Sequence, residues 1–492
     1  MSDSPLLECL ISTLNQQSIT YCHWKSNLYL RDSLAEHRDV DLLVDRKDVQ
    51  RIEGALASLG FKRIIDPHGS VPSVFHFYGR DSTTCEFVHV HVYYRIVTGE
   101  SLLKNYCFPL EELYLQNRRW VDGMALPERA AELMLFVVRT MVKHASLAEY
   151  LLLLRRGWSG NESLQEELDA LVDDDTVLRC SELLVEWLPS VDPALFSDCL
   201  DAIRARTPLA YRLWLAFRLR RQLKVYDRFS LPSEIFAHLR ILLQRAYGRW
   251  RGRRTKQFAA GGRVIAFVGP EATGKSTLVT ETVNWLGEVF DIGSVHLGKP
   301  PSTWLTRLPN LAAPLLRKLM PRHRMSQLED DPGARDASRG SLLYSIRSIL
   351  VAWDRYHLAV RLHRQAANGR IIICDRYPSA IVGAMDSARL RAPARTRGWG
   401  KLLGYFAKLE NRIYRQMPPP DVVIRLTVPV EVAIERNRER EKEGKEAEAY
   451  VRRRHNTDTA PEFPAARIME LDTNQSKLQT IRAARLAVWD AL

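Results

Sequence analysis

The chain has 492 residues, of which 46% are hydrophobic and 26% charged, and this predicts a soluble, globular protein of two or three domains. The formal net charge of +13 and the pI of about 9.4 favour anionic partners such as nucleotides, nucleic acid or an anionic membrane surface. No apolar run approaches the roughly 18 residues that a bilayer span needs, so no membrane span is expected.

The start of the chain and the cysteine pattern predict the compartment. Residues 1–17 lack the basic-then-apolar layout of a secretory signal. The seven cysteines are scattered without a CxxC pair, which predicts reduced, buried thiols and neither disulfides nor a zinc site. We therefore expect a cytoplasmic protein. Nucleic acid is not excluded as a partner, and a homodimer is left open.

Residues 1–120 mix short strands with helices and predict an α+β domain. The segment "DVDLLV" at 39–44 predicts a strand, and "CEFVHVHVYYR" at 85–95 alternates with period two, as a half-buried strand does. Between them lies a predicted helix with apolar residues at helical spacing: Val49, Ile52, Leu56 and Leu59.

The segment from Tyr21 to Phe61 resembles the nucleotidyltransferase superfamily. That fold has a Gly-Ser turn, where this chain has Lys25-Ser26, followed by a strand that carries Asp-x-Asp, which Asp39 and Asp41 fit. Residues two apart on a strand face the same way, so both carboxylates can share metal ions that bind a nucleoside triphosphate. An exposed polar strand edge is the alternative.

A third carboxylate on a later strand normally completes such a site. The candidate strand offers His89 and His91 on one face instead, with Glu86 on the other. These histidines either ligate a metal or contact phosphate, or they indicate that transferase chemistry has been lost and only binding remains.

Residues 121–250 read as almost entirely helical, with apolar faces that predict the core of a bundle. Residues 251–262 are basic and then Gly-containing, and predict a linker. From Arg263 to the end, apolar strands alternate with helices, which is typical of an α/β domain with a parallel sheet.

A phosphate-binding loop opens this last domain. The segment "GPEATGKS" from Gly269 to Ser276 fits GxxxxGK[ST], after the apolar strand "RVIAFV" and before a helix. Glycines let successive N–H groups point at phosphate oxygens, and the helix N-terminus adds partial positive charge. We expect Lys275 to reach the transferred phosphoryl group of ATP and Ser276 to ligate Mg²⁺. The predicted nucleotide-binding residues are Gly269, Pro270, Ala272, Thr273, Gly274, Lys275, Ser276 and Thr277.

Two further segments point at the same cleft. The strand "RIIIC" runs into Asp375, where an acid holds Mg²⁺ or its water shell, although a helix N-cap is the alternative. Arg376 follows and offers a fork of donors to a phosphate. Upstream, Arg355 interrupts a long amphipathic helix; it either reaches the acceptor pocket or belongs to a charged face turned to water.

Downstream, a strand at 422–428 and a helix lead into a run of basic residues that includes Arg436 and Arg440. This run predicts a lid whose arginines close over the transferring phosphoryl group; a solvated face is the alternative.

Residues 263–492 resemble the thymidylate kinases, which belong to the nucleoside monophosphate kinase group. The resemblance lies in the phosphate loop with an acid at its third position, the helical "WDRYH", the strand-end "DRY", the strand–helix–lid segment and the closing "IMELDTN". It implies that Glu271 binds the acceptor sugar, that Arg376 holds the acceptor phosphate, and that Arg355 and Tyr377 lie near the acceptor.

The chain departs from that family at the parts that read the base. It has "VHLGKPPSTW" in place of the Arg-Glu-Pro-Gly-Gly segment, and "PSAIVGAMDSARL" in place of the run ending in Ala-Tyr-Gln that helps to frame thymine. The phosphate-handling parts are therefore present and the base-reading parts are not.

Three functional hypotheses follow. The first is a P-loop kinase that transfers the γ-phosphoryl group of Mg·ATP to a nucleoside monophosphate, dTMP first, or to a related phosphorylated small molecule. The second is nucleotidyl transfer at Asp39 and Asp41. The third is a nucleotide-binding regulatory protein with weak catalysis.

Overall fold

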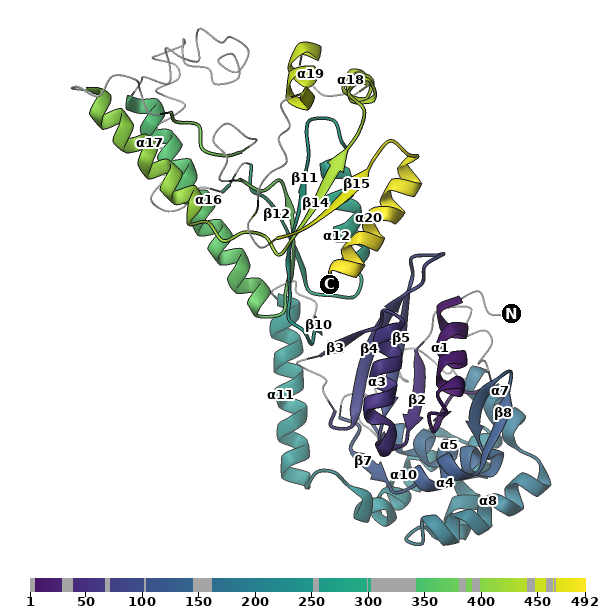
Figure 1. The fold of residues 1–492 in the computed structure, drawn as a ribbon. Helices are drawn as coiled ribbons and strands as arrows, with labels where there is room; N and C mark the ends of the chain where they lie inside the picture. The colour runs from purple at the N-terminus through teal and green to yellow at the C-terminus, as the bar shows by residue number, and fades with distance from the viewer. Residues whose placement is uncertain are drawn as a thin grey trace. The chain divides into compact units, whose positions relative to one another are not determined.

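The chain forms two compact units, Met1–Ala259 and Ala260–Leu492 (Figure 1). The division falls inside the segment 251–262 that was expected to be a linker, and two residues of that segment form a short strand, β10 (Gln257–Phe258). The computed structural model describes residues 5–28, 39–66, 71–100, 103–144, 162–250, 256–298, 300–301, 342–379, 386–391, 399–439, 447–456, 463 and 466–492.

A mixed six-stranded sheet organises the N-terminal unit, in the order β1-β2-β5-β4-β3-β10. The central strands β2 and β5 are parallel, and the other neighbours are antiparallel. As the alternation predicted, β2 and β5 form from 39–44 and 85–95. The bounds are β1 Tyr21–His23, β2 Val40–Val44, β3 Lys62–Ile65, β4 Val74–Arg80 and β5 Phe87–Tyr93.

Helices surround this sheet and share its core. One buried cluster runs from Leu7 of the first helix to Leu223 after α10, so helices from the middle region and the strands exclude water together. The helices are α1 Pro5–Gln16, α3 Val49–Ser58, α4 Glu111–Gln116, α5 Arg129–His144, α7 Glu162–Leu171, α8 Asp174–Trp187, α9 Pro193–Arg204, α10 Leu209–Gln222 and α11 Leu231–Trp250.

Two hairpins complete the unit: β6 (Ile96–Thr98) with β7 (Tyr106–Phe108), and β8 (Arg118–Val121) with β9 (Met124–Pro127). The second hairpin lies partly in the region expected to be helical. Its turn, Asp122-Gly123, has φ of +49° and +79°, the left-handed pair that a two-residue hairpin turn requires. This local turn chemistry outweighs the helical composition of the residues that follow.

The C-terminal unit is built on a five-stranded parallel sheet in the order β12-β13-β11-β14-β15. The apolar runs at 264–268, 371–374 and 422–427 form its three central strands, which are largely buried because helices cover both faces, whereas the two edge strands are half-buried or exposed. The strands are β11 Val264–Val268, β12 Ile292–His296, β13 Ile371–Asp375, β14 Val422–Thr427 and β15 Arg467–Asp472.

Helices α16 and α17 lie side by side on one side of this sheet, and α12 and α20 lie on the other (Figure 1). Val264, Ala266 and Val268 of the central strand share one buried cluster with α16. The helices are α12 Lys275–Gly287, α16 Leu342–Ala367, α17 Trp399–Arg415, α18 Val430–Glu439, α19 Glu448–Asn456 and α20 Lys477–Ala491.

The carboxyl ends of β11, β12 and β13 meet at one edge of the sheet. Phe267 of β11 and His296 of β12 both pair with Asp375 at the end of β13. In open parallel sheets, ligands bind at this edge. Among the described helices, none is long and apolar enough to cross a bilayer.

Candidate functional site

The phosphate loop connects β11 to α12 and depends on two glycines. Gly269 has φ of +150°, and a Cβ there would lie 2.6 Å from the carbonyl oxygen of Leu426. Gly274 has φ of +89° and caps the N-terminus of α12. Neither position accepts a larger residue without strain, because one is closed by backbone and both have left-handed φ. The loop geometry is therefore fixed by the sequence motif itself.

Lys275 is buried within this loop. Its ammonium donates to the carbonyl oxygens of Gly269 at 2.9 Å and Pro270 at 2.5 Å, and lies 3.4 Å from Thr273 Oγ1. The Thr273 hydroxyl also donates to Pro270 at 3.0 Å. The lysine charge is thus held at the centre of the turn from which the N-terminus of α12 projects.

Ser276 and Asp375 form the part of the site that fits Mg²⁺. The Ser276 hydroxyl donates to Asp375 Oδ2 at 2.8 Å, although 99 residues separate them in the chain. The second carboxylate oxygen, Oδ1, is buried without a hydrogen-bond partner among the described residues. A buried, unused carboxylate oxygen beside a hydroxyl suits a hard cation that takes oxygen ligands.

Arg376 lies between two carboxylates. Its guanidinium is 3.4 Å from Glu271 of the phosphate loop and 3.5 Å from Asp386. The backbone of Arg376 has a left-handed φ of +69°, so the extended strand ends here. Its backbone N–H donates to the carbonyl oxygen of Phe267 at 3.0 Å. Burial lowers the pKa of Arg376, but Glu271 and Asp386 outweigh this and the pKa is raised, so the group stays charged.

Arg355 of α16 is almost fully buried, with 3% of its surface exposed. An arginine has five N–H donors, and here all five meet protein acceptors. They are Leu297 O at 3.0 Å, Gly298 O at 2.8 Å, Asp386 O at 2.6 Å, Asp386 Oδ1 at 3.1 Å and Tyr414 Oη at 2.7 Å. The N–H groups of Arg355 that were expected to reach the phosphoryl acceptor therefore bind the protein itself. Two of them hold Asp386, which faces Arg376.

Tyr377 also lies inside the protein. Its hydroxyl donates to the carbonyl oxygen of Pro418 at 2.5 Å, and its ring packs edge-on against Phe463 at 5.8 Å. Burial raises the pKa of Tyr377. The structure thus places this member of the strand-end motif in the core next to α16, behind Arg376.

Helices α18 and α19 pack on the phosphate loop. Val451 of α19 belongs to the same buried cluster as Ala272 of the loop, and His455 Nε2 lies 2.9 Å from the carbonyl oxygen of Glu271. Arg436 of α18 donates to Thr473 O at 2.7 Å and Oγ1 at 3.3 Å. Arg440, the second predicted lid arginine, lies outside the described residues.

A cavity of about 360 Å³ opens beside the loop. It is lined by the loop and the start of α12, by Arg436, and by the segment that joins β15 to α20. Neither Glu271 nor Arg376 lines it, so the cavity does not include the arginine–carboxylate group. The lining residues are Ala272, Thr273, Gly274, Thr277, Leu278, Arg436, Thr473, Gln475, Lys477, Thr480 and Ile481.

In the N-terminal unit, Asp39 and Asp41 meet histidines of the neighbouring strand. Asp39 Oδ1 lies 2.7 Å from His89 Nδ1, and Asp41 Oδ1 lies 3.0 Å from His91 Nδ1 and 2.9 Å from Lys25 Nζ. Burial raises the pKa of Asp39, but the bond from His89 outweighs it, and the pKa is lowered to about 2. The pKa of Asp41 is likewise lowered, against burial, chiefly by Lys25 and His91. Both acids are therefore ionised and already partnered.

Two curated relatives are similar to part of the chain. The uncharacterized ATP-binding protein YghS of Escherichia coli is 27% identical over 239 residues, which are 47% of this chain and 94% of that protein. A thymidylate kinase of Cyanothece sp. is 30% identical over 187 residues, 36% of this chain and 67% of the kinase. Over about half of its length, the chain belongs to the thymidylate kinase family.

This thymidylate kinase-like half carries homology to ATP-binding P-loop proteins. No family model matches the chain. A solved thymidylate kinase from Candida albicans superposes at 17% identity with a TM-score of 0.27, over 47% of this chain and 90% of that one. The nucleotidyltransferase resemblance of the N-terminal unit stays a prediction.

The thymidylate kinase-like site includes residues that sequence reasoning missed. Asp386 binds both Arg355 and Arg376, but the segment around it carries no motif. His296 Nδ1 lies 2.9 Å from the carbonyl oxygen of Asp375, and its place at the end of the second strand was a usable signal. His455 follows three arginines in α19, which the predicted lid segment stopped short of.

Proposed function

We propose that the C-terminal unit transfers the γ-phosphoryl group of Mg·ATP to a nucleoside monophosphate or a related phosphorylated small molecule, with dTMP as the first candidate. The observation that carries the proposal is the contact of 3.4 Å between Arg376 and Glu271. This contact joins the end of β13 to the phosphate loop. Arg376, which would bind the acceptor phosphate, therefore lies beside the loop that would bind the phosphates of ATP.

On the donor side, the loop backbone and Lys275 hold the triphosphate. The N-terminus of α12 favours negative charge, and Lys275 adds a full positive charge at the turn. The cavity lined by Arg436 and Thr473 lies on this side of the loop and is a suitable volume for the nucleoside of ATP.

Ser276 and Asp375 would hold Mg²⁺, which would neutralise charge on the donor phosphates. The direct bond of 2.8 Å between the two side chains keeps both oxygens at the edge of the sheet. His296, bonded to the backbone of Asp375, fixes the end of that strand from the other side.

On the acceptor side, Arg376 would bind the acceptor phosphate and Glu271 its sugar hydroxyl. Both pairs that hold the Arg376 guanidinium are 3.4 Å or longer, and 28% of this side chain is exposed, so its fork remains accessible to an incoming phosphate. Arg355 acts through Asp386 as a positioning residue, because its own donors are all used.

The lid would supply positive charge when transfer occurs. Helix α19 presents Arg452, Arg453 and Arg454 next to His455, which contacts the loop, and Arg436 and Arg440 belong to the same basic region. Arginines at this position stabilise the charge that develops on the transferring group.

The test is transfer from Mg·ATP to a panel of nucleoside monophosphates, with dTMP first, followed by product analysis. We expect multi-turnover formation of one nucleoside diphosphate. Tight ATP binding without transfer to any acceptor would contradict the kinase and favour the third hypothesis, a nucleotide-binding regulatory protein with weak catalysis.

Arg376→Lys provides the matched variant for the acceptor that the panel identifies. Lysine keeps the charge but cannot bind a phosphate with a planar fork. We expect kcat/KM for the acceptor to fall by about 10- to 100-fold, which corresponds to the 1.5–3 kcal/mol of one hydrogen bond to a charged group. Arg412→Lys, at an exposed arginine of α17, should change nothing.

The cytoplasm is part of this proposal. It rests on the scattered cysteines of the sequence. The expectation that these thiols are buried is wrong for two of them, since Cys9 is exposed and Cys107 half-buried.

Nucleotidyl transfer by the N-terminal unit is the second candidate, and the position of Asp39 and Asp41 beside the first parallel pair of strands favours it. Metal ions bound directly by these acids would have to displace His89, His91 and Lys25. Incubation with triphosphates labelled at the α-phosphate tests it. Incorporation into an acceptor that is lost in Asp41→Asn would support transfer, whereas no incorporation with any acceptor would exclude it.

A further inference from the structure

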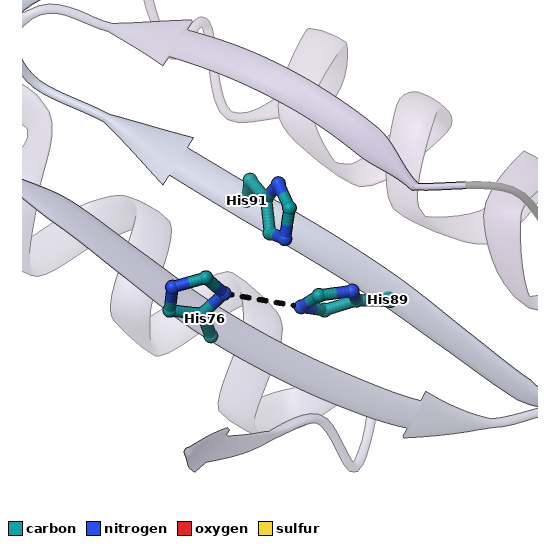
Figure 2. Close-up of side chains that lie close together, drawn as sticks. All are labelled: His76, His89 and His91. Carbon is teal, nitrogen blue, oxygen red and sulfur yellow. Dashed lines mark hydrogen bonds between the residues drawn. The ribbon is translucent and has the colours of Figure 1, made fainter. Parts of the chain in front are cut away.

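Strands β4 and β5 bring three histidines together, far in sequence from the phosphate loop. His76 of β4 is paired in register with His91 of β5, and His89 lies two residues away on the same face of β5. Figure 2 shows the three rings converging. One ring nitrogen from each lies within 4.8 Å of the others.

Two of the rings are oriented by carboxylates. Asp39 accepts from His89 Nδ1 at 2.7 Å, and Asp41 from His91 Nδ1 at 3.0 Å. A carboxylate oxygen accepts in each of these bonds, so Nδ1 is the donor, and in a neutral imidazole Nε2 is then the nitrogen with the lone pair. This carboxylate–histidine arrangement is the usual support for an imidazole that binds a metal through its other nitrogen.

The inner nitrogens have the spacing that a metal requires: His76 Nδ1 and His89 Nε2 share a hydrogen bond, which a bound ion would replace (Figure 2), and only His91 Nε2 has no partner among the described residues. His76 Nδ1 and His89 Nε2 are 3.2 Å apart, close to the roughly 3.3 Å between neighbouring ligands of tetrahedral zinc with Zn–N bonds of about 2.0–2.1 Å. His91 Nε2 is buried and has no hydrogen-bond partner in the described part of the chain. A buried nitrogen such as His91 Nε2 normally has a hydrogen-bond partner, and a bound cation would take the place of that partner.

We propose that His76, His89 and His91 bind one transition-metal ion of the zinc class, with Asp39 and Asp41 as outer carboxylates that hold the rings. Three imidazole nitrogens select zinc-like ions over Mg²⁺, which takes oxygen ligands. The proposal assigns the aspartates a supporting role instead of direct ligation, and it is independent of phosphoryl transfer in the other unit.

Three protein ligands leave one position of a tetrahedral ion open. Two lysines lie near the cluster, and one of them, Lys25, already pairs with Asp41 at 2.9 Å. Lys25 and Lys104 both donate to the hydroxyl of Tyr93, at 3.3 and 2.9 Å, and the Tyr93 ring lies 6.2 Å from that of His91.

The test uses the untagged full-length chain, stripped with a chelator and titrated with Zn²⁺ in excess Mg²⁺, which occupies oxygen sites. Calorimetry and elemental analysis should give one tightly bound zinc per chain. Co²⁺ in its place should give the visible absorption of a nitrogen-ligated ion of low coordination number. No tight binding, or binding without that absorption, would overturn the proposal.

Variants locate the site. The double variant His76→Ala, His91→Ala should lose the zinc, and Asp39→Asn, at a side chain 58% exposed and hence tolerant of change, should weaken binding by about 10- to 100-fold. His238→Ala is the matched control, a carboxylate-paired histidine elsewhere in the unit, 2.6 Å from Glu100. Wild-type affinity in Asp39→Asn together with full zinc content in the double variant would refute the site. If the double variant does not fold, Asp39→Asn decides alone.

Discussion

Lys275→Ala is expected to lower the rate of phosphoryl transfer by about 10²- to 10³-fold, the effect of removing one donor aimed at developing charge. The lysine ammonium lies 2.9 Å from Gly269 O and 2.5 Å from Pro270 O, inside the loop that would hold the triphosphate. Alanine removes that charge and leaves the glycines that shape the backbone. Single-turnover transfer with Mg·ATP and the acceptor identified by the panel measures the loss.

Lys408→Ala, at an exposed lysine of α17, serves as the control and should retain full activity. A melting temperature of Lys275→Ala close to that of the wild type would assign the loss to chemistry and not to folding. Unchanged turnover in Lys275→Ala would remove the phosphate loop from the mechanism. Zinc binding by the N-terminal unit should be the same in this variant, since that proposal does not depend on the loop.

Arg355→Ala is expected to lower the free energy of unfolding of the C-terminal unit by about 3–5 kcal/mol, because it removes the closer partner of the buried Asp386 carboxylate and leaves only the 3.5 Å contact with Arg376. The ion pair with Asp386 is 3.1 Å long, and only 3% and 9% of the two side chains are exposed. Three carbonyl oxygens and the Tyr414 hydroxyl lose their donor as well. Chemical denaturation, followed by fluorescence, measures the change.

Arg361→Ala, at an exposed arginine of the same helix, should change stability by no more than about 0.5 kcal/mol. The two roles considered for Arg355 predict different results. If Arg355 is a positioning residue, its replacement lowers stability. It weakens acceptor binding only indirectly, through Asp386 and Arg376. Wild-type stability combined with a large rise in KM for the acceptor would instead indicate direct contact with substrate.

The chain Arg355–Asp386–Arg376 explains why α16 matters to a site at the end of β13. Asp386 accepts from Arg355 and faces Arg376 at 3.5 Å. A buried charge needs a partner with good geometry, and here two arginines from different elements share one carboxylate. The acceptor side of the site is therefore set by side-chain packing between elements, in contrast to the donor side.

The fold of the C-terminal unit could be predicted because its signals are local. Apolar strand segments such as 264–268 and 371–374, glycine turns and long helices each follow from short stretches of chain. The same holds for the phosphate loop, where Gly269 and Gly274 impose the backbone that the motif implies. The hairpin at Asp122-Gly123 was not predicted, because the helical composition of the residues after it led us to expect helix from residue 121 onward. In the structure the two-residue turn decides the local conformation.

The sequence by itself determined the parallel α/β unit, the phosphate loop and the acid at the end of β13, because each depends on neighbouring residues. Only the tertiary structure decided which distant side chains meet: it directs all five donors of Arg355 inward, brings Asp386 to Arg376, and joins His76 to His89 and His91. The physical reason is that hydrogen bonds and ion pairs depend on distances of about 3 Å, and strand register and helix packing set those distances between segments that share no motif.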